Sequence, residues 1–104
     1  MGRPSWLIDV DELKVELLRG AVRLLDVREK EEWERFKLPD AFHIPLSELK
    51  KSAKNVFHEN DDIVIYCAHG NRSVEAILIL RPLGFKKMRS LEGGIETWKQ
   101  SAKG

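Results

Sequence analysis

Apolar residues occur along the chain in short runs and at helical spacing, separated by glycines, prolines and charged turns. Two nearly continuous apolar runs, at residues 22–27 and 62–67, predict buried strands. Shorter runs at residues 6–8, 42–44 and 87–91 predict three more strands. The spacing between these runs leaves room for helices and short connections, so we expect strands and helices to alternate.

Apolar positions three or four residues apart predict the helices. Asp9 and Glu12 have the spacing of a capping box, and Gly20 ends the helix that they begin. Further helices are predicted at residues 28–35, 46–53, 72–83 and 95–103, and Pro82 predicts a bent end for the fourth helix of the chain. The pattern indicates an α/β fold with a doubly wound, mostly parallel sheet and helices on both faces. Ligands bind such sheets at the carboxyl ends of the strands.

Length and charge restrict the functional classes. The 104 residues (12.0 kDa) predict a single domain, residues 1–104. The net charge of +1 favours neither a nucleic acid nor a membrane as partner. No apolar run has the length of a signal peptide or membrane span, and a cytoplasmic location is expected. Three scattered histidines, His43, His58 and His69, predict no metal site, and we expect no cofactor.

Cys67, the single cysteine, stands where the apolar run 62–67 ends. The next residues predict a short polar loop and the start of a helix: Ala68, His69, Gly70, Asn71, Arg72 and Ser73. A loop that curls around the sulfur points backbone N–H groups at it, and Gly70 allows the positive φ that such a curl often needs. With Arg72 and the helix N-terminus, these groups favour a thiolate. We therefore predict a nucleophile for sulfur or phosphorus, since no histidine–asparagine pair suited to a peptide carbonyl is evident.

Each of these residues also has a simpler interpretation. A lone cysteine at the end of an apolar strand is most often a small buried hydrophobe. Arg72 either contacts a substrate or pairs with a carboxylate, and Arg28 either lines the pocket or pairs with Asp26. His69 is expected to face solvent, with its N–H as part of the loop rather than its ring as an acid. The alternatives for Arg72 and Arg28 stay open at this point.

Four segments, in order, carry motifs of one family: Asp26-Val27-Arg28-Glu29 with Glu32-Trp33; Ala41 to Ile44-Pro45-Leu46; Tyr66-Cys67-x-x-Gly70-x-Arg72-Ser73; and Leu91-Glu92-Gly93-Gly94-Ile95-x-x-Trp98. On these motifs the chain resembles a single-domain rhodanese, a sulfurtransferase, nearly end to end. It departs from the family at residues 36–41, where the usual Gly-His-Ile-Pro-Gly-Ala turn is replaced.

The resemblance implies a rhodanese-like fold and a thiosulfate sulfurtransferase activity without cofactor. Cys67 would accept a sulfane sulfur from a donor such as thiosulfate, as a persulfide, and pass it to cyanide or a thiol. Ala68, His69, Gly70, Asn71, Arg72, Ser73 and Arg28 are the expected substrate-binding residues. A sulfur-carrier protein is a further candidate partner, and the alternative function is a protein-interaction module of the same fold.

Loop length separates this activity from a second one within the resemblance. Rhodanese-like phosphatases and arsenate reductases have five residues between cysteine and arginine, which makes a ring wide enough for a tetrahedral oxyanion. Only four residues separate Cys67 from Arg72. The shorter loop favours sulfur transfer over phosphate hydrolysis.

Overall fold

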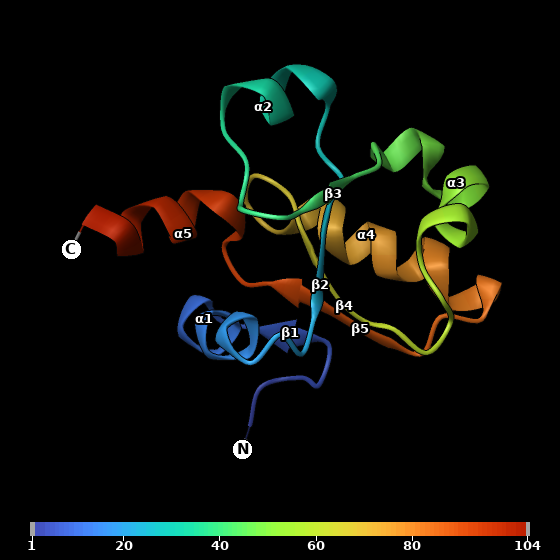
Figure 1. Ribbon diagram of the computed structural model, residues 1–104, viewed down its shortest axis with the longest axis horizontal. Coiled ribbons are helices and arrows are strands. Elements are labelled where there is room, and N and C mark those ends of the chain that lie inside the picture. The colour runs from blue at the N-terminus through green and yellow to red at the C-terminus, as the bar shows by residue number, and fades with distance from the viewer. Residues whose placement is uncertain (1, 104) are drawn as a thin grey trace.

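Strands and helices alternate along residues 2–103, which the computed structural model describes (Figure 1). The strands are β1 (Leu7–Ile8), β2 (Arg23–Asp26), β3 (Phe42–His43), β4 (Asp62–Tyr66) and β5 (Lys87–Leu91). The α-helices are α1 (Val10–Leu18), α2 (Lys30–Arg35), α3 (Leu49–Val56), α4 (Asn71–Leu80) and α5 (Gly94–Lys103). Two 3₁₀-helices, η1 (Leu46–Glu48) and η2 (Arg81–Leu83), precede α3 and follow α4.

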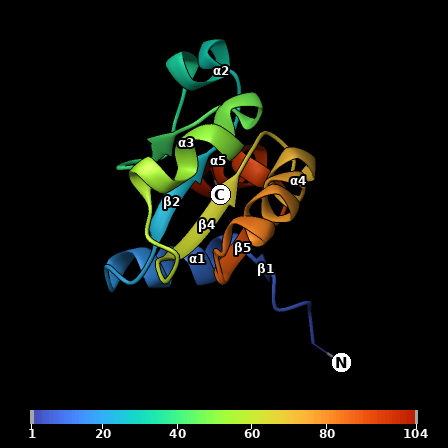
Figure 2. The ribbon, with the colours of Figure 1, turned by 90° about the vertical axis from the view of Figure 1, so that its right-hand side faces the viewer.

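The strands form one sheet in the order β1-β5-β4-β2-β3, and every pair is parallel. The predicted α/β class is confirmed, with an all-parallel sheet in place of a mostly parallel one. β4 lies in the middle, and its Ile65 is level with Leu25 of β2 and Ser90 of β5. The carboxyl ends of β2 and β4 therefore lie side by side, at the edge of the sheet above which α2 stands (Figures 1 and 2).

Alternate residues of the central strands enter two separate cores. Ile63 and Ile65 pack on one face with side chains of α3 and α4, including Leu49, Ile77 and Leu80. Val64 and Tyr66 pack on the other face with α1 and α5, including Leu13 and Ile95. A strand's side chains alternate between its faces, so a continuous apolar run supplies both cores. The predicted helices on both faces are confirmed.

Several helix ends follow the local chemistry of the chain. The capping box is present, because Glu12 N–H donates to Asp9 Oδ1 at 2.8 Å and Asp9 N–H donates to Glu12 Oε1 at 2.9 Å. α4 stops at Leu80, and Pro82 lies in η2, since proline lacks the N–H that an α-helix would need there. Among residues 2–103, no helix combines the length and apolar character needed to cross a membrane.

Candidate active site

Cys67 follows the last residue of β4 and is 1% exposed. The chain then turns back through Ala68, His69 and Gly70, and α4 begins at Asn71, the last of the four residues that separate Cys67 from Arg72 (Figure 2). Gly70 caps this helix with φ 109°, a left-handed conformation that glycine adopts without steric cost. The predicted curl is therefore present, with the sulfur on its inner side.

Backbone donors surround the sulfur. The N–H groups of Gly70 and Ser73 donate to Cys67 Sγ at 3.1 and 3.3 Å, and Ser73 Oγ lies 3.5 Å from Sγ. Burial by itself raises the pKa of the thiol, but hydrogen bonds from the Ser73 side chain and from three backbone N–H groups of the loop outweigh it. The pKa of Cys67 is lowered as a result, so the site favours a thiolate, the nucleophilic form.

The Ser73 hydroxyl is itself held by a second serine. Ser73 Oγ lies 2.6 Å from Ser90 Oγ of β5 and donates to the Gly70 carbonyl at 3.2 Å. Both serines are buried. When Cys67 is a thiolate it can only accept, so the single Ser73 hydroxyl proton is shared between the sulfur and the Gly70 carbonyl, and Ser90 can donate to Ser73. Sequence analysis did not identify Ser90, because only the register of β4 and β5 brings it to the site.

The start of α5 sets the direction of the loop. Ile95 N–H donates to the Cys67 carbonyl at 2.9 Å, and Glu96 N–H donates to the Ala68 carbonyl at 3.2 Å. Because these carbonyls are held by α5, the following N–H groups are free to face the sulfur. Gly94 lies so close to the loop that a Cβ atom there would overlap the backbone of Cys67 and Ala68. From the sequence, Gly94 was identified only as part of a motif and not for its contact with the loop.

Arg72 forms a bidentate ion pair with Glu32 of α2. Its Nη1 and Nη2 atoms donate to Oε1 and Oε2 at 2.7 and 2.9 Å, with about a third of each side chain exposed (33% and 34%). The Arg72 hydrogen bonds lower the pKa of Glu32 to about 2, so this carboxylate is ionised at neutral pH. Of the two roles left open for Arg72, the structure shows the pairing with a carboxylate; contact with a substrate stays a prediction.

Arg28 forms a buried ion pair with Asp26, the second of the two alternatives for this residue. Asp26 is fully buried and Arg28 is 4% exposed, and Arg28 Nη2 donates to Asp26 Oδ2 at 2.7 Å. The same Nη2 donates to the Phe36 carbonyl at 2.5 Å, just after α2. Arg28 therefore ties the end of α2 to β2, and its expected contact with a substrate stays a prediction.

The other expected site residues lie in the loop after β4 or at the start of α4. Ala68 is half-buried, and the side chains of His69 and Asn71 are exposed. The backbone N–H of His69 contributes to lowering the pKa of Cys67. His69 is therefore placed as the sequence predicted, with an N–H in the loop and a ring toward solvent.

Residues 9–101 match the family described as the rhodanese-like domain. The chain belongs to this family. Its rhodanese-like relatives include the human thiosulfate:glutathione sulfurtransferase, which is 31% identical over 110 residues, with 93% of this chain and 94% of that protein covered. The putative sulfur carrier protein YrkF of Bacillus subtilis (strain 168) is 42% identical over 78 residues, and these cover 75% of this chain but only 42% of YrkF.

Solved structures share the rhodanese-like fold. The crystal structure of a rhodanese-related protein from Thermoplasma volcanium superposes with a TM-score of 0.82, at 33% identity and with 91% of each chain covered. The two relatives by sequence named above are a sulfurtransferase and a putative sulfur carrier.

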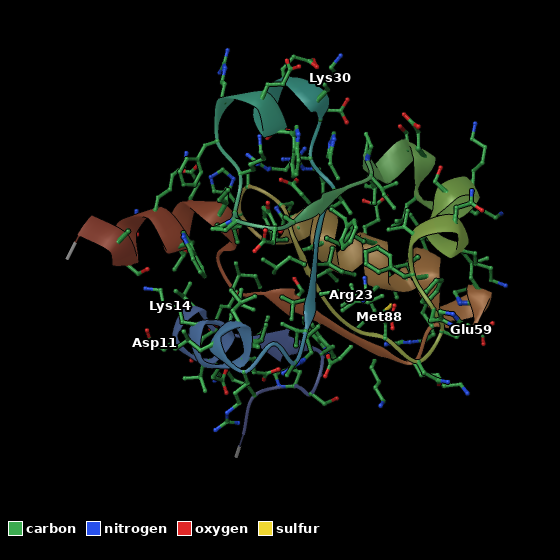
Figure 3. All side chains as sticks on the ribbon, in the orientation of Figure 1. Asp11, Lys14, Arg23, Lys30, Glu59 and Met88 are labelled. Atoms are coloured by element: carbon green, nitrogen blue, oxygen red, sulfur yellow. The ribbon has the colours of Figure 1, made fainter. Side chains whose placement is uncertain are left out.

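An apolar groove of about 610 Å³ lies elsewhere on this rhodanese-like domain, between α1, α5 and the start of β2. No residue of the segment 67–73 lines it. Lys14 and Arg23, which Figure 3 labels, are among its lining residues and lie well below α2 in that view. The cavity volume alone therefore does not locate the Cys67 site.

Proposed function

We propose that this chain is a sulfurtransferase that moves a sulfane sulfur from a donor such as thiosulfate to a thiophilic acceptor, cyanide or a thiol. Cys67 carries the sulfur as a persulfide. The observation that carries the proposal is the arrangement around Sγ, where N–H groups of Gly70 and Ser73 stabilise a thiolate without a partner base. A thiolate formed in this way can attack sulfur directly, and little proton movement is needed.

The reaction consists of two displacements at sulfur. The thiolate attacks the outer sulfur of thiosulfate, an S–S bond forms to Cys67, and sulfite leaves with the electron pair of the broken S–S bond. Cyanide then attacks the outer sulfur of the persulfide, and thiocyanate leaves as the Cys67 thiolate is restored. Charge is conserved in both steps, so neither an oxidant nor a metal is required.

Each expected substrate-binding residue has a role in this proposal. Gly70 and Ser73 stabilise the thiolate that attacks and that is released again, while Ala68, His69 and Asn71 form the rim that the donor crosses. Because Cys67 is 1% exposed, a slender terminal sulfur atom approaches it more readily than a bulky group. Arg72 lies at the entrance as the partner of Glu32, and Arg28 holds the end of α2 through the Phe36 carbonyl.

Hydrolysis of phosphate esters is the competing function for a thiolate beside an arginine. The four-residue loop supports sulfur transfer instead, because the N–H groups converge on one sulfur atom. The arginine that would hold phosphoryl oxygens is also occupied by Glu32 on both of its terminal nitrogens.

A sulfur-carrier protein is the second class of partner for the same chemistry. It is favoured by the similarity to YrkF, whose name describes a sulfur carrier and of which this chain spans less than half. In that case the persulfide passes to a protein thiol, and cyanide serves only as a laboratory acceptor. The cytoplasm, where thiols stay reduced, suits such a transfer.

The test is turnover of thiosulfate and cyanide to sulfite and thiocyanate, beside an aryl phosphate as the alternative substrate. We expect thiocyanate from the wild-type chain, none from Cys67→Ser, and negligible aryl phosphate hydrolysis from either. Ser47→Ala, an exposed change in η1, is the control and should turn over normally. Phosphate hydrolysis at a rate comparable with sulfur transfer, lost in Cys67→Ser, would move the function to a phosphatase.

A further inference from the structure

Glu32 places a negative charge at the entrance to the Cys67 loop. It lies on α2, which stands above the loop that follows β4 in both ribbon views (Figures 1 and 2). Its partner Arg72 precedes Ser73, whose N–H donates to the Cys67 sulfur. The sulfur is also close enough to Arg72 for its charge to raise the pKa of that guanidinium, after the larger effect of Glu32.

The position of Glu32 is held from two directions. Oε1 accepts hydrogen bonds from Arg72 at 2.7 Å and from the Glu29 N–H at 2.9 Å, the second being part of the capping box of α2. The far end of α2 is tied to the sheet through the Phe36 carbonyl and Arg28. These hydrogen bonds hold the Glu32 carboxylate beside Arg72.

The pair leaves the entrance with little positive charge. Both terminal nitrogens of Arg72 are directed at Glu32, so an incoming anion finds a guanidinium that is already neutralised. The charge of Glu29 also raises the pKa of Arg72, so a second carboxylate lies near the guanidinium. Behind the entrance stands the Cys67 thiolate, a further negative charge.

We propose that Glu32 is a specificity-determining residue that disfavours doubly charged sulfur donors and leaves the site selective for donors with one negative charge or none, such as an alkyl persulfide. This inference rests on the proposed sulfurtransferase function and names the donor class for the same site. Thiosulfate, a dianion, is then a slow donor, because the thiolate repels both of its charges and the guanidinium that would attract them is neutralised by Glu32. A singly charged donor meets about half of that repulsion.

Thiosulfate and methanethiosulfonate make a matched pair of probes. The second replaces one oxygen of thiosulfate by a methyl group and carries one negative charge instead of two. In both, the Cys67 thiolate attacks the terminal sulfur and the S–S bond breaks; sulfite leaves in one case and methanesulfinate in the other. The product on the protein is the same persulfide, so a single readout serves both donors.

The experiment compares the wild-type chain with Glu32→Gln. Glutamine keeps an oxygen for the Glu29 N–H and removes the charge, so the start of α2 is preserved. The second-order rate constant of persulfide formation is measured for each donor by quenched intact-mass spectrometry. We expect Glu32→Gln to raise the thiosulfate rate relative to the methanethiosulfonate rate by about fivefold, the order expected for one nearby charge.

Glu34→Gln is the matched control, since Glu34 is exposed on the same helix and forms no ion pair or hydrogen bond among the contacts of the described residues. It makes the same change in net charge and should leave the ratio of the two rates within about twofold of wild type, because screening weakens a distant exposed charge. An equal effect of both variants would assign the change to overall charge and overturn the proposal.

The remaining outcomes are also decisive. An unchanged ratio in Glu32→Gln, or an equal loss of rate with both donors, would show that Glu32 only positions Arg72, and the proposal would be wrong while the sulfurtransferase function stands. Persulfide formation with neither donor in the wild-type chain would overturn the function and this inference with it.

Discussion

Among single residues, the chemistry depends most on Cys67, whose buried sulfur atom must hold a negative charge. Cys67 loses the solvation of water, and hydrogen bonds from the loop and from Ser73 replace it. Ser73 has one proton, and Gly70 O and the thiolate both accept it. Ser90, 2.6 Å away, can supply the hydrogen bond that Ser73 accepts in turn. Ser90 is therefore expected to act as a positioning residue.

The first prediction is that the thiol titrates below its ordinary pKa of about 8.5. Ser73→Ala should raise the pKa, and Ser90→Ala should raise it by a smaller amount, because Ser90 acts only through Ser73. Thiolate absorbance measured against pH gives the three values. Ser47→Ala, far from these contacts in the chain, is the control; a wild-type pKa at or above the ordinary value would contradict the arrangement of donors.

The free energy of unfolding should change with pH as Cys67 titrates. The pKa of Cys67 is depressed in the folded state, so the thiolate contributes stability above the unfolded pKa of about 8.5. That contribution is lost as pH falls through the lower, folded pKa. Between the two values the folded state binds fewer protons, and the free energy of unfolding rises with pH. Cys67→Ser should abolish this slope in urea unfolding curves.

The site residues that are close to Cys67 in the sequence could be predicted, whereas those that approach it only in the folded chain could not. Gly70 and Ser73 follow the cysteine directly, so their N–H groups could be placed from the loop alone. Glu32 lies 35 positions before Cys67, and its contact with Arg72 requires α2 to fold over the edge of the sheet. No local pattern carries that information.

At the scale of secondary-structure elements, α5 and the loop after β4 form one unit. The first N–H groups of α5 hold the carbonyls of Cys67 and Ala68, and they are among the donors that a helix start leaves free. Gly93 and Gly94 both have positive φ at this junction (74° and 64°), which brings α5 close to the loop. The direction of the sulfur's donors is therefore determined partly by a helix that begins 27 residues later in the chain.

Gly94→Ala tests this contact. Its Cβ would overlap the backbone of Cys67 and Ala68, and its φ of 64° is already strained for alanine. We expect the free energy of unfolding to fall by about 3 kcal/mol or more and sulfur transfer to be largely lost. Urea unfolding and the persulfide rate measure the two effects.

Gly20→Ala is a well-matched control for that experiment. Gly20 has φ 65°, nearly the same as Gly94, but a Cβ there would meet no atom within 4 Å. It should cost only about 1 kcal/mol, the strain of the left-handed conformation, and leave sulfur transfer intact. Equal losses at the two glycines would mean that backbone strain, and not contact with the loop, accounts for the effect.

The elements themselves were largely predictable, with errors at their ends and in their exposure. β2 is two residues shorter than the strand predicted at 22–27, and β4 is one residue shorter than the strand predicted at 62–67. The second half of α4 is an unbroken apolar run, yet Leu78 within it is 61% exposed. One face of a helix meets the sheet, so an apolar residue on the opposite face stays outside whatever its hydropathy.

At the scale of the whole molecule, the parallel sheet gathers the chemistry at one edge. Cys67 directly follows β4. Asp26 ends β2 and pairs with Arg28, which holds α2, and β5 carries Ser90. The alternation of strands and helices in the sequence predicts such an edge. The order β1-β5-β4-β2-β3 does not follow from that alternation, since it depends on which strands pair across the two cores. It is this order that places Ser90 next to the cysteine's own strand.

The intact mass of the protein after incubation with a sulfane donor shows whether Cys67 carries the sulfur as a persulfide. With thiosulfate or methanethiosulfonate, the wild-type chain should gain the mass of one sulfur atom, and cyanide or dithiothreitol should remove it. Cys67→Ser should gain nothing, because an alcohol cannot form a persulfide. A wild-type chain that stays unmodified with both donors, or an adduct that persists in Cys67→Ser, would contradict the account.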